Sequence, residues 1–456
     1  MSVSSRIRNV LSPEMPAGLS VSGATHPAQV RMLADLTFTR DSQQITEQVI
    51  FDVIEQVIAN AQEFLVLDMF LFNPDHPQVH ECPRLSAHIT EALIERKRVL
   101  PQLPILLITD PMNTFYGAYS RDYFERMRVA GIEVVETNLD ALPDSNPAYS
   151  ALYRGLLSKL PVGASVLPNA LHPPGPKVSA HAYTQLLNFK ANHRKVILNE
   201  REAVVSSANP HDASAPNANF GFHVSGGVVA DLLASEHAVY AFSVPDGTFF
   251  DNLSMEIDAG DEGGADTASL LTEGAIRKRV VELIHSARPG ELLTIGMFYF
   301  SERSIINALK DAVRRGARVQ VILDKNKDAF GRSKTGLPNL PASAELADAG
   351  IQVRWAATTG EQYHPKFIAL LAPDAIEIIA GSGNFTRRNV GDFNLETSLH
   401  VRSTRPEFIR EFIDYWTRQW KNHGATFTQS LDEYKKPAAW QYLVYRLQEA
   451  TGLSTF

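Results

Sequence analysis

Two halves of this 456-residue chain carry the same motifs in the same order, and this internal repeat constrains the fold more than any other feature. The first half has an amphipathic stretch at 45–61, with Ile45, Val49, Val53 and Val57 on one stripe, followed by the apolar run FLVLDMFLF at 64–72. The second half has a similar stretch at 275–287, followed by LLTIGMFYF at 292–300. Helical spacing followed by a short apolar run predicts a helix and then a strand in each half.

The repeat continues beyond these strands. LPILLITDPMN (103–113) and ARVQVILDKNK (317–327) are both apolar runs that close on an aspartate. AGIEVV (130–135) and AGIQVR (349–354) each predict a helix end followed by a strand. The order β-α-β-α-β within each half predicts an α/β fold with two tandem, duplicated domains and a mixed, partly parallel sheet.

The repeat also suggests where the domains begin and end. We expect an N-terminal extension at 1–40, a first domain at 41–245, a linker at 246–271, a second domain at 272–425 and a C-terminal extension at 426–456. Glycine and acidic residues mark the linker as exposed. The first half alone holds an insertion at about 138–180, whose prolines favour a structured surface loop over a helix. A loop of that length is typical of a lid or a substrate-binding element.

Composition limits the class of protein. A hydrophobic content of 44% with 21% charged residues is typical of a globular protein, and the single cysteine, Cys82, excludes an intramolecular disulfide and fits a reducing compartment. The first twenty residues do not resemble a secretory signal, and the longest apolar run is too short to span a membrane. We therefore expect a cytoplasmic protein whose membrane contact, on the inner face, is peripheral.

The net charge of −8 bears on the partner. Proteins that bind nucleic acid nonspecifically are usually basic, because neutralised phosphates supply their affinity. The charge argues against a nucleic-acid partner, although a basic cleft can lie on an acidic protein.

Two predicted hairpins hold the residues that carry chemistry. NHRKVILNEREAVVSSANP (192–210) opens with His193 and Lys195 and closes with Ser207 and Asn209. YHPKFIALLAPDAIEIIAGSGNF (363–385) repeats the pattern with His364, Lys366, Ser382 and Asn384. Residues two apart on a strand point to the same face, so each hairpin gathers its four polar side chains at one end. Two copies at the same place in a repeat argue against coincidence.

This paired motif resembles the signature of the phospholipase D superfamily, His-x-Lys-x4-Asp followed by Gly-Ser-x-Asn, and the resemblance covers about residues 45 to 425. It implies two α/β domains, each a mixed sheet flanked by helices, whose hairpins converge on one cleft and exchange a phosphodiester through a phosphohistidine. The match has two departures: Glu200 stands at the first Asp position, and the nearest second carboxylate, Asp374, comes three residues late. The Asp of the family mainly organises the hairpin, so these changes bear on local geometry.

The resemblance also implies roles for the side chains. One neutral imidazole attacks phosphorus, while the other, protonated, donates to the leaving oxygen. Lys195 and Lys366 neutralise the phosphate oxygens, and Asn209, Asn384, Ser207 and Ser382 bind them as donors, so no metal or other cofactor is expected.

Glu396 stands where the family places a carboxylate that binds a catalytic imidazole. If it orients His364 of its own half, His364 is the general acid and His193 the nucleophile. In the first half, His223 lies near the corresponding position.

Three aromatic stretches outside the motifs are expected to pack in the core rather than bind substrate or membrane. They are Phe115-Tyr116, the FYF at 298–300, and EFIDYWTRQW at 411–420.

The layout most resembles the bacterial cardiolipin synthase and phosphatidyltransferase subgroup, which implies a glycerophospholipid donor and a phosphatidyl-histidine intermediate. Two alternatives stay open: a nuclease of the same superfamily, and an inactive scaffold. The sequence leaves open the headgroup, the acyl chains and the choice between transfer and hydrolysis. Two motif copies in one chain remove the need for an oligomer to complete the site.

Overall fold

The computed structural model describes residues 12–75, 84–159, 161–253, 264–326, 328–329, 332–333, 335–431 and 437–451. Cys82 and residues 254–263 of the expected linker lie outside these ranges.

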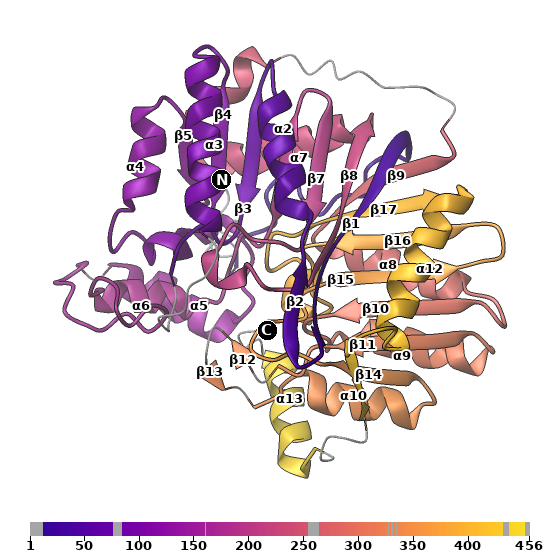
Figure 1. Ribbon diagram of the computed structural model, residues 1–456. Helices are drawn as coiled ribbons and strands as arrows, with labels where there is room; N and C mark the ends of the chain where they lie inside the picture. Colours follow the sequence, from indigo (N-terminus) through magenta and orange to yellow (C-terminus); the bar gives the residue numbers. More distant parts are fainter. Residues whose placement is uncertain are drawn as a thin grey trace, which may run out of the picture.

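One long mixed sheet runs through both halves of the chain (Figure 1). Its first-half strands are β1 (His26–Arg40), β2 (Gln43–Glu47), β3 (Leu65–Met69), β4 (Ile105–Thr109), β5 (Glu133–Glu136), β6 (Lys195–Asn199), β7 (Glu202–Ser206) and β8 (Asn219–Gly226). Its second-half strands are β9 (Asp266–Thr272), β10 (Leu292–Met297), β11 (Arg318–Leu323), β14 (Gln352–Ala356), β15 (Lys366–Leu371), β16 (Ile376–Gly381), β17 (Thr397–Ser403) and β18 (Thr428–Ser430). The short strands β12 (Asp328–Ala329) and β13 (Arg332–Ser333) pair only with each other.

The strand order confirms the duplication. The first half reads β5-β4-β3-β6-β7-β8-β1, and the second reads β14-β11-β10-β15-β16-β17-β9 in the same spatial sense. In each half the first three strands of this order are parallel and the others are antiparallel, and in the second half β18 adds an antiparallel strand beyond β14. The two half-sheets join where β1 pairs with β9.

Helices cover the outer face of each half-sheet. The first half uses α2 (Ile50–Asn60), α3 (Leu85–Val99) and α4 (Asp122–Val129), and the second uses α8 (Gly274–Ser286), α9 (Arg303–Arg314) and α10 (Asn339–Asp348). The helices α7 (Val228–Ser243) and α12 (Pro406–Trp420) pack instead into the core that both halves share. A short helix, α11 (Arg387–Val390), follows β16, and α13 (Ala439–Thr451) lies near the C-terminus.

The sheet corrects the expected boundaries. β1 falls in the stretch expected to be an extension, β9 begins inside the expected linker, and β18 lies in the expected C-terminal extension. β1 and β9 are the first strands of the two repeats, but QVRMLADLTF and DTASLLT share no motif. Their equivalence is visible only from their pairing, so the repeat appeared to start at the following helix.

The helix expected at 45–61 begins at Ile50, because Ile45 lies on β2 and pairs with β1. The carboxylate of Asp35 accepts the backbone N–H groups of Val49 and Ile50, at 2.8 and 3.2 Å, and so satisfies two donors at the start of the helix. The helix expected at 275–287 is confirmed as α8.

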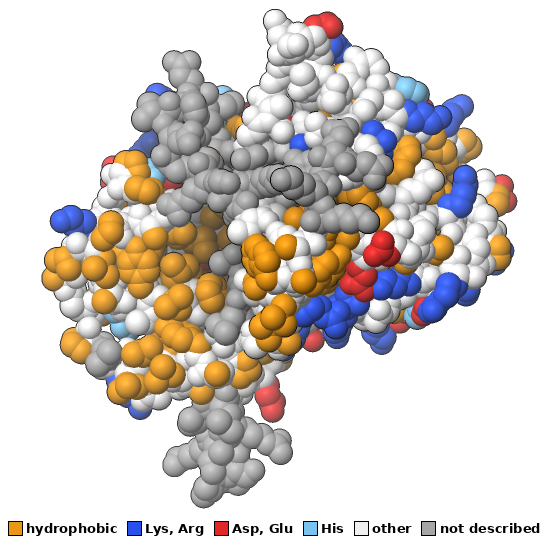
Figure 2. Space-filling view, turned by 90° about the horizontal axis from the view of Figure 1, so that it is seen from below, with side chains coloured by type: hydrophobic (Ala, Val, Ile, Leu, Met, Phe, Trp, Pro, Cys, Tyr) orange, Lys and Arg blue, Asp and Glu red, His pale blue; other side chains and the backbone are white. Residues whose placement is uncertain are grey.

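The insertion at 138–180 is only partly the loop that its prolines predicted. It contains a helix, α5 (Pro147–Gly155), which Asn146 caps and Pro147 begins, since proline fits the first turn of a helix. Residues 161–168 do form an exposed loop, which leads towards a second helix, α6 (Ala180–Leu186). These elements project from the left of the molecule in Figure 1, and hydrophobic side chains gather on the left when it is seen from below (Figure 2).

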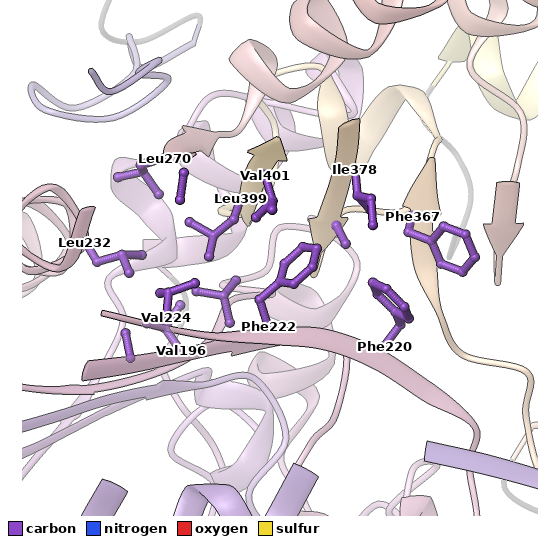
Figure 3. Packing of buried hydrophobic residues seen from close by; sticks show 14 of the residues in the cluster. Val196, Phe220, Phe222, Val224, Leu232, Leu270, Phe367, Ile378, Leu399 and Val401 are labelled. Atoms are coloured by element: carbon purple, nitrogen blue, oxygen red, sulfur yellow. The ribbon is translucent and has the colours of Figure 1, made fainter. Parts of the chain in front are cut away.

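The largest apolar cluster lies between the two half-sheets. Phe220 and Phe222 of β8 face Phe367 and Ile378 of the second half (Figure 3). The rings of Phe220 and Phe367 are 4.7 Å apart at their centroids. From α12, Phe412, Tyr415 and Trp416 pack on the same cluster, which confirms the core prediction for 411–420. The two halves therefore form one folding unit.

We expect Phe220→Ala to lower the free energy of unfolding by about 3–5 kcal/mol, because it opens a cavity in the core between the halves. Urea unfolding measures the loss, and both halves should unfold in one transition. Val129→Ala, at a side chain 89% exposed on α4, is the control and should change stability by less than about 0.5 kcal/mol. A Phe220→Ala variant as stable as this control would contradict a shared core.

Candidate active site

Each predicted hairpin forms as expected, and its polar end meets the other half of the chain. Just before β6, the N–H of His193 donates to the carbonyl of Leu395, at 2.9 Å. Just before β15, the N–H of His364 donates to the carbonyl of Ala218, also at 2.9 Å. Each histidine thus belongs to one half and is anchored by backbone of the other.

This crossing overturns the expected partner of Glu396. Its carboxylate lies 3.0 Å from Nδ1 of His193, not beside His364. Glu396 immediately precedes β17 of the second half, where Ser382 and Asn389 also donate hydrogen bonds to it. The expectation that Glu396 binds the histidine of its own half was wrong. Backbone hydrogen bonding between His193 and Leu395 brings Glu396 of the second half to the histidine of the first half.

His364 has an uncharged partner. Its Nδ1 lies 3.1 Å from Oδ1 of Asn219, which also accepts a hydrogen bond from the Ser207 hydroxyl at 3.1 Å. Asn219 is therefore the first-half counterpart of Glu396. The sequence had placed His223 near that position, but His223 pairs with Glu202 at 2.6 Å. The sequence did not predict Asn219, because the family places an acidic residue at this position and asparagine is uncharged. The motif residue Ser207 needs a hydrogen-bond acceptor nearby, and this requirement is a signal that could have identified Asn219.

The two motif serines have similar surroundings. Ser207 donates to Asn219 and accepts the N–H of Phe220 at 3.1 Å, while Ser382 donates to Glu396 and accepts the N–H of Thr397 at 3.0 Å. They were expected to donate to a phosphate. Because each hydroxyl hydrogen points to an imidazole partner instead, we assign the serines a positioning role.

Each motif lysine contacts the backbone of the histidine in its own motif. Nζ of Lys195 donates to the carbonyl of His193 at 2.6 Å, and Nζ of Lys366 donates to that of His364 at 2.8 Å. Each ammonium group also lies over a phenylalanine ring, Phe70 or Phe298, at 4.9 and 5.3 Å. The same rings contact His193 and His364 edge-on, at 4.7 and 5.0 Å between centroids.

The motif asparagines have fixed orientations. Oδ1 of Asn209 accepts the N–H of Leu71, and Oδ1 of Asn384 accepts that of Tyr299, both at 3.3 Å. Both asparagines line the same cavity as the imidazoles, so the amide Nδ2 of each is the donor available to a ligand.

Residues shared by the repeats brace this arrangement. Asp110 and Asp324, the aspartates that close the two matched apolar runs, accept the N–H groups of Asn192 and Tyr363, each at 2.8 Å. These N–H groups directly precede the two histidines.

The residue between His193 and Lys195 is also fixed. Arg194 is fully buried and donates to Glu273 at 2.8 Å and to Glu236 at 3.1 Å. Glu273 in turn accepts the N–H of Glu396 at 3.0 Å, which links Arg194 to the partner of its neighbouring histidine.

The substituted carboxylates of the motif behave differently. Glu200 accepts the N–H groups of Gln62 and Glu63 and so organises the approach to β3. Asp374 lies exposed in the turn between β15 and β16.

The imidazoles open into a cavity of about 350 Å³ between the halves. Its polar lining includes His193, His364, Asn209, Asn384 and Arg388. Its apolar lining includes Met112, Tyr116, Leu171, Leu186, Leu187 and Phe189, all from the first half of the chain. Tyr116, Phe298 and Tyr299, expected only in the core, line this cavity as well. Of the aromatic residues at 115–116, only Phe115 is a purely core residue.

Burial and like charges dominate the electrostatics. Burial, then the charges of Lys195 and Lys366, holds the pKa values of His193 and His364 well below their usual range, so both imidazoles are neutral in the free protein at pH 7. Burial likewise lowers the pKa of Lys195 to about 7 and that of Arg388 to about 10. It raises the pKa of Glu396 to about 7. An anion in the cavity would favour the charged form of each cation, so the site is suited to a phosphate.

The hydrogen bonds also fix which ring nitrogen can react. Because Nδ1 of His193 faces a carboxylate and Nδ1 of His364 faces an amide oxygen, each Nδ1 carries its proton and each Nε2 keeps its lone pair. Two such imidazoles can act in turn as nucleophile and proton carrier. In the described part of the chain, no three His, Cys, Asp or Glu side chains cluster as metal ligands would.

Sequence and structure comparisons identify similar proteins. Residues 280–420 match the family described as "Cardiolipin synthase, PLD-like domain". None of the curated proteins compared with the chain matches its sequence.

Among solved structures, phosphatidylserine synthase of Haemophilus influenzae is similar at 11% identity, covering 99% of this chain and 98% of that one, with a TM-score of 0.57. The phospholipase D family member Nuc of Salmonella typhimurium is 23% identical over 36% of this chain and 99% of its own, with a TM-score of 0.29. Polyphosphate kinase of Porphyromonas gingivalis is 14% identical over 93% of this chain and 53% of its own, with a TM-score of 0.43. Only the first score is high enough to support an argument, and it shows a shared fold.

We expect nitrogen NMR of labelled histidine, recorded above neutral pH, to show His193 with its proton on Nδ1. Glu396→Ala removes the acceptor and should move the tautomer towards Nε2–H. Glu377→Ala, which removes the partner of His400 instead, should leave the His193 signals unchanged. A His193 tautomer indifferent to Glu396 would contradict the assignment.

Proposed function

We propose that this chain belongs to the phospholipase D superfamily and that it transfers or hydrolyses the phosphodiester of a glycerophospholipid through a phosphohistidine, without a metal ion. The observation that carries the proposal is the cavity, whose lining combines two neutral imidazoles and the buried Arg388 with leucine, methionine and aromatic side chains. A phospholipid has the same division between a charged phosphodiester and an apolar body. The matched family and the phosphatidylserine synthase structure, both named for phospholipid enzymes, agree with this substrate class.

The first step begins at His193. Its Nε2 lone pair attacks phosphorus, a nitrogen–phosphorus bond forms, and the bond to the leaving oxygen breaks. His364 gives that oxygen a proton. It can be protonated at this stage because the bound phosphodiester anion offsets the two lysine charges that otherwise hold its pKa low.

The second step reverses the proton transfer. An alcohol or water gives its proton to His364 as its oxygen attacks phosphorus, and the bond to His193 breaks. Between the steps, the phosphorylated imidazole of His193 is positively charged, and the ionised Glu396 stabilises it through Nδ1–H. Asn219 offers His364 no such charge. The carboxylate was expected to mark the general acid, but stabilisation of the charged intermediate gives it another role, and on that ground we assign the nucleophile to His193.

The remaining polar groups bind the phosphate oxygens. Lys195, Lys366 and Arg388 supply positive charge, and Asn209 and Asn384 supply directed donors. Their orientation precedes substrate binding, so little reorganisation is needed when charge develops. This charge is what a metal ion provides in other phosphodiesterases.

The apolar lining also separates this function from its rivals. A nuclease of the same superfamily would use the same imidazoles and cations, but a polar nucleic-acid backbone makes no use of the leucines that line the same cavity. An inactive scaffold would not need both imidazoles held in reactive tautomers. Within the lipid enzymes, we place the chain with the cardiolipin synthase and phosphatidyltransferase subgroup, with glycerol, another headgroup or water as acceptor.

The location follows the substrate. No helix in the described ranges is both long and apolar enough to cross a bilayer. We propose that the protein works from the cytoplasmic side, at the inner face of the membrane. Since both halves of one chain complete the site, a monomer is sufficient.

We expect the wild-type protein to turn over fluorescent phosphatidylglycerol in the presence of a chelator and to leave single-stranded DNA uncut. His193→Ala and His364→Ala should each lower kcat by at least about a thousandfold. His400→Ala, at a buried histidine paired with Glu377, is the control and should keep most activity. In His364→Ala, mass spectrometry should find the phosphatidyl group on His193. Cleavage of DNA alone would favour the nuclease, and turnover of neither substrate would favour the scaffold.

We expect kcat/KM to rise with pH towards about 7, because Glu396, whose pKa is raised to about 7, must lose its proton to stabilise the charged imidazole. Below that pH the neutral carboxyl gives no such stabilisation. At higher pH, kcat/KM should fall as Lys195, whose pKa is lowered to about 7, loses its charge. Glu396→Gln should abolish the rise and lower activity by about tenfold to a hundredfold. Glu377→Gln should leave the profile unchanged. A rise that persists in Glu396→Gln would show that another group is titrating.

A further inference from the structure

The insertion in the first half exposes an unusual number of large apolar side chains. Seven are at least one-third exposed: Leu152, Leu156, Val162, Val166, Leu167, Leu171 and Leu187. Every residue from 161 to 168 is exposed, in the sequence PVGASVLP. Contiguous exposed apolar surface of this kind marks a site of interaction. We call residues 147–187 the apolar rim.

The apolar rim is continuous with the reaction cavity. Leu171 and Leu187 are both exposed at the surface, at 41% and 44%, and both line the cavity that holds His193 and His364. An apolar path therefore leads from the outside of the molecule to the imidazoles. A protein bound over these leucines would block the entrance of the cavity. A lipid surface bound there would instead provide lipid molecules that can enter the cavity.

Charge along the rim is one-sided. Although the chain has 51 acidic residues, none lies between positions 145 and 199. The exposed cations Lys159 and Lys177 flank the exposed loop. A segment that has no carboxylate of its own and carries exposed lysines favours contact with anionic lipid headgroups.

Helix α13 adds a second apolar strip. Trp440, Leu443 and Leu447 are exposed at helical spacing on one face of it. In Figure 1 this helix projects at the bottom of the molecule, whereas the insertion projects from its left. A tryptophan beside leucines on an amphipathic helix is suited to the boundary between headgroups and acyl chains.

We propose that the apolar rim docks the protein onto a bilayer containing anionic phospholipid, so that a lipid passes from the membrane into the cavity along Leu171 and Leu187. This inference builds on the proposed function, because it names the source of the substrate. The loop at 161–168 lies shallowly among the headgroups, where its backbone stays hydrated, and Lys159 and Lys177 contact lipid phosphates.

The test separates docking from catalysis. The rim variant Leu156→Ser/Val162→Ser/Val166→Ser removes three side chains that are 56%, 62% and 63% exposed and lie outside the cavity. The matched control, Val99→Ser/Val129→Ser, removes apolar side chains 52% and 89% exposed on α3 and α4. Binding is measured by cosedimentation with vesicles of phosphatidylglycerol and phosphatidylcholine, and turnover is measured on vesicles and on a short-chain phosphatidylglycerol below its micelle concentration.

We expect the rim variant to bind these vesicles at least about tenfold more weakly than wild type, and the control variant to bind as wild type does. Turnover of the short-chain lipid should be unchanged in both. Lys159→Glu/Lys177→Glu should weaken binding to the mixed vesicles and lessen its dependence on salt.

His193→Ala should bind vesicles as wild type does, so the docking result stands even if no lipid is turned over. Wild-type protein that binds vesicles without acting on any lipid would refute the proposed function and not the docking. Equal binding by the rim and control variants, or no binding by wild type, would overturn the docking.

Discussion

The two backbone hydrogen bonds that cross between the halves are the constraint on which this structure depends. The N–H groups of His193 and His364 donate to Leu395 and Ala218, so that each imidazole is carried by one repeat and oriented by the other. The core around Phe220 and Phe367 holds the repeats close enough for this exchange. Neither repeat by itself has both histidines and their partners. The candidate site therefore forms only when the two halves pack together.

Burying charged side chains between the two halves lowers the stability of the folded protein. Lys195, Lys366 and Arg388 are removed from water, and their pKa values fall as a result although Glu396 and neighbouring aspartates oppose the fall. Aromatic rings and backbone carbonyls offset part of the desolvation. The part that is not offset would favour binding of an anion. The features that destabilise the folded protein are therefore the ones that the proposed function would use to bind a phosphodiester.

Much of this could be predicted from the sequence, because the duplicated motifs hold side chains that no apolar core requires. His193, Lys195, Asn209 and their second copies were predicted in this way, and the histidines and asparagines among them line one cavity. The partner of each histidine could not be found, since Glu396 and Asn219 reach their imidazoles only after the repeats cross. The equivalence of β1 and β9 could not be predicted for a related reason. Their amino-acid sequences differ, and only their pairing with β8 and β17 shows that they occupy the same place in the two repeats. The prolines of the insertion favoured a loop and so did not predict α5. Proline disrupts the interior of a helix, but Pro147 lies in the first turn of α5, where proline is tolerated.

The insertion occurs in one repeat only, and this breaks the near-twofold equivalence of the two histidines. Both imidazoles present the same ring nitrogen to the cavity, yet most of its aliphatic lining comes from the first repeat. Under the proposed function, a phosphodiester with one hydrocarbon arm would bind with that arm against Leu171, Leu186 and Leu187. The direction of binding would then be set by residues that take no part in bond breaking, separately from the carboxylate that distinguishes His193 from His364.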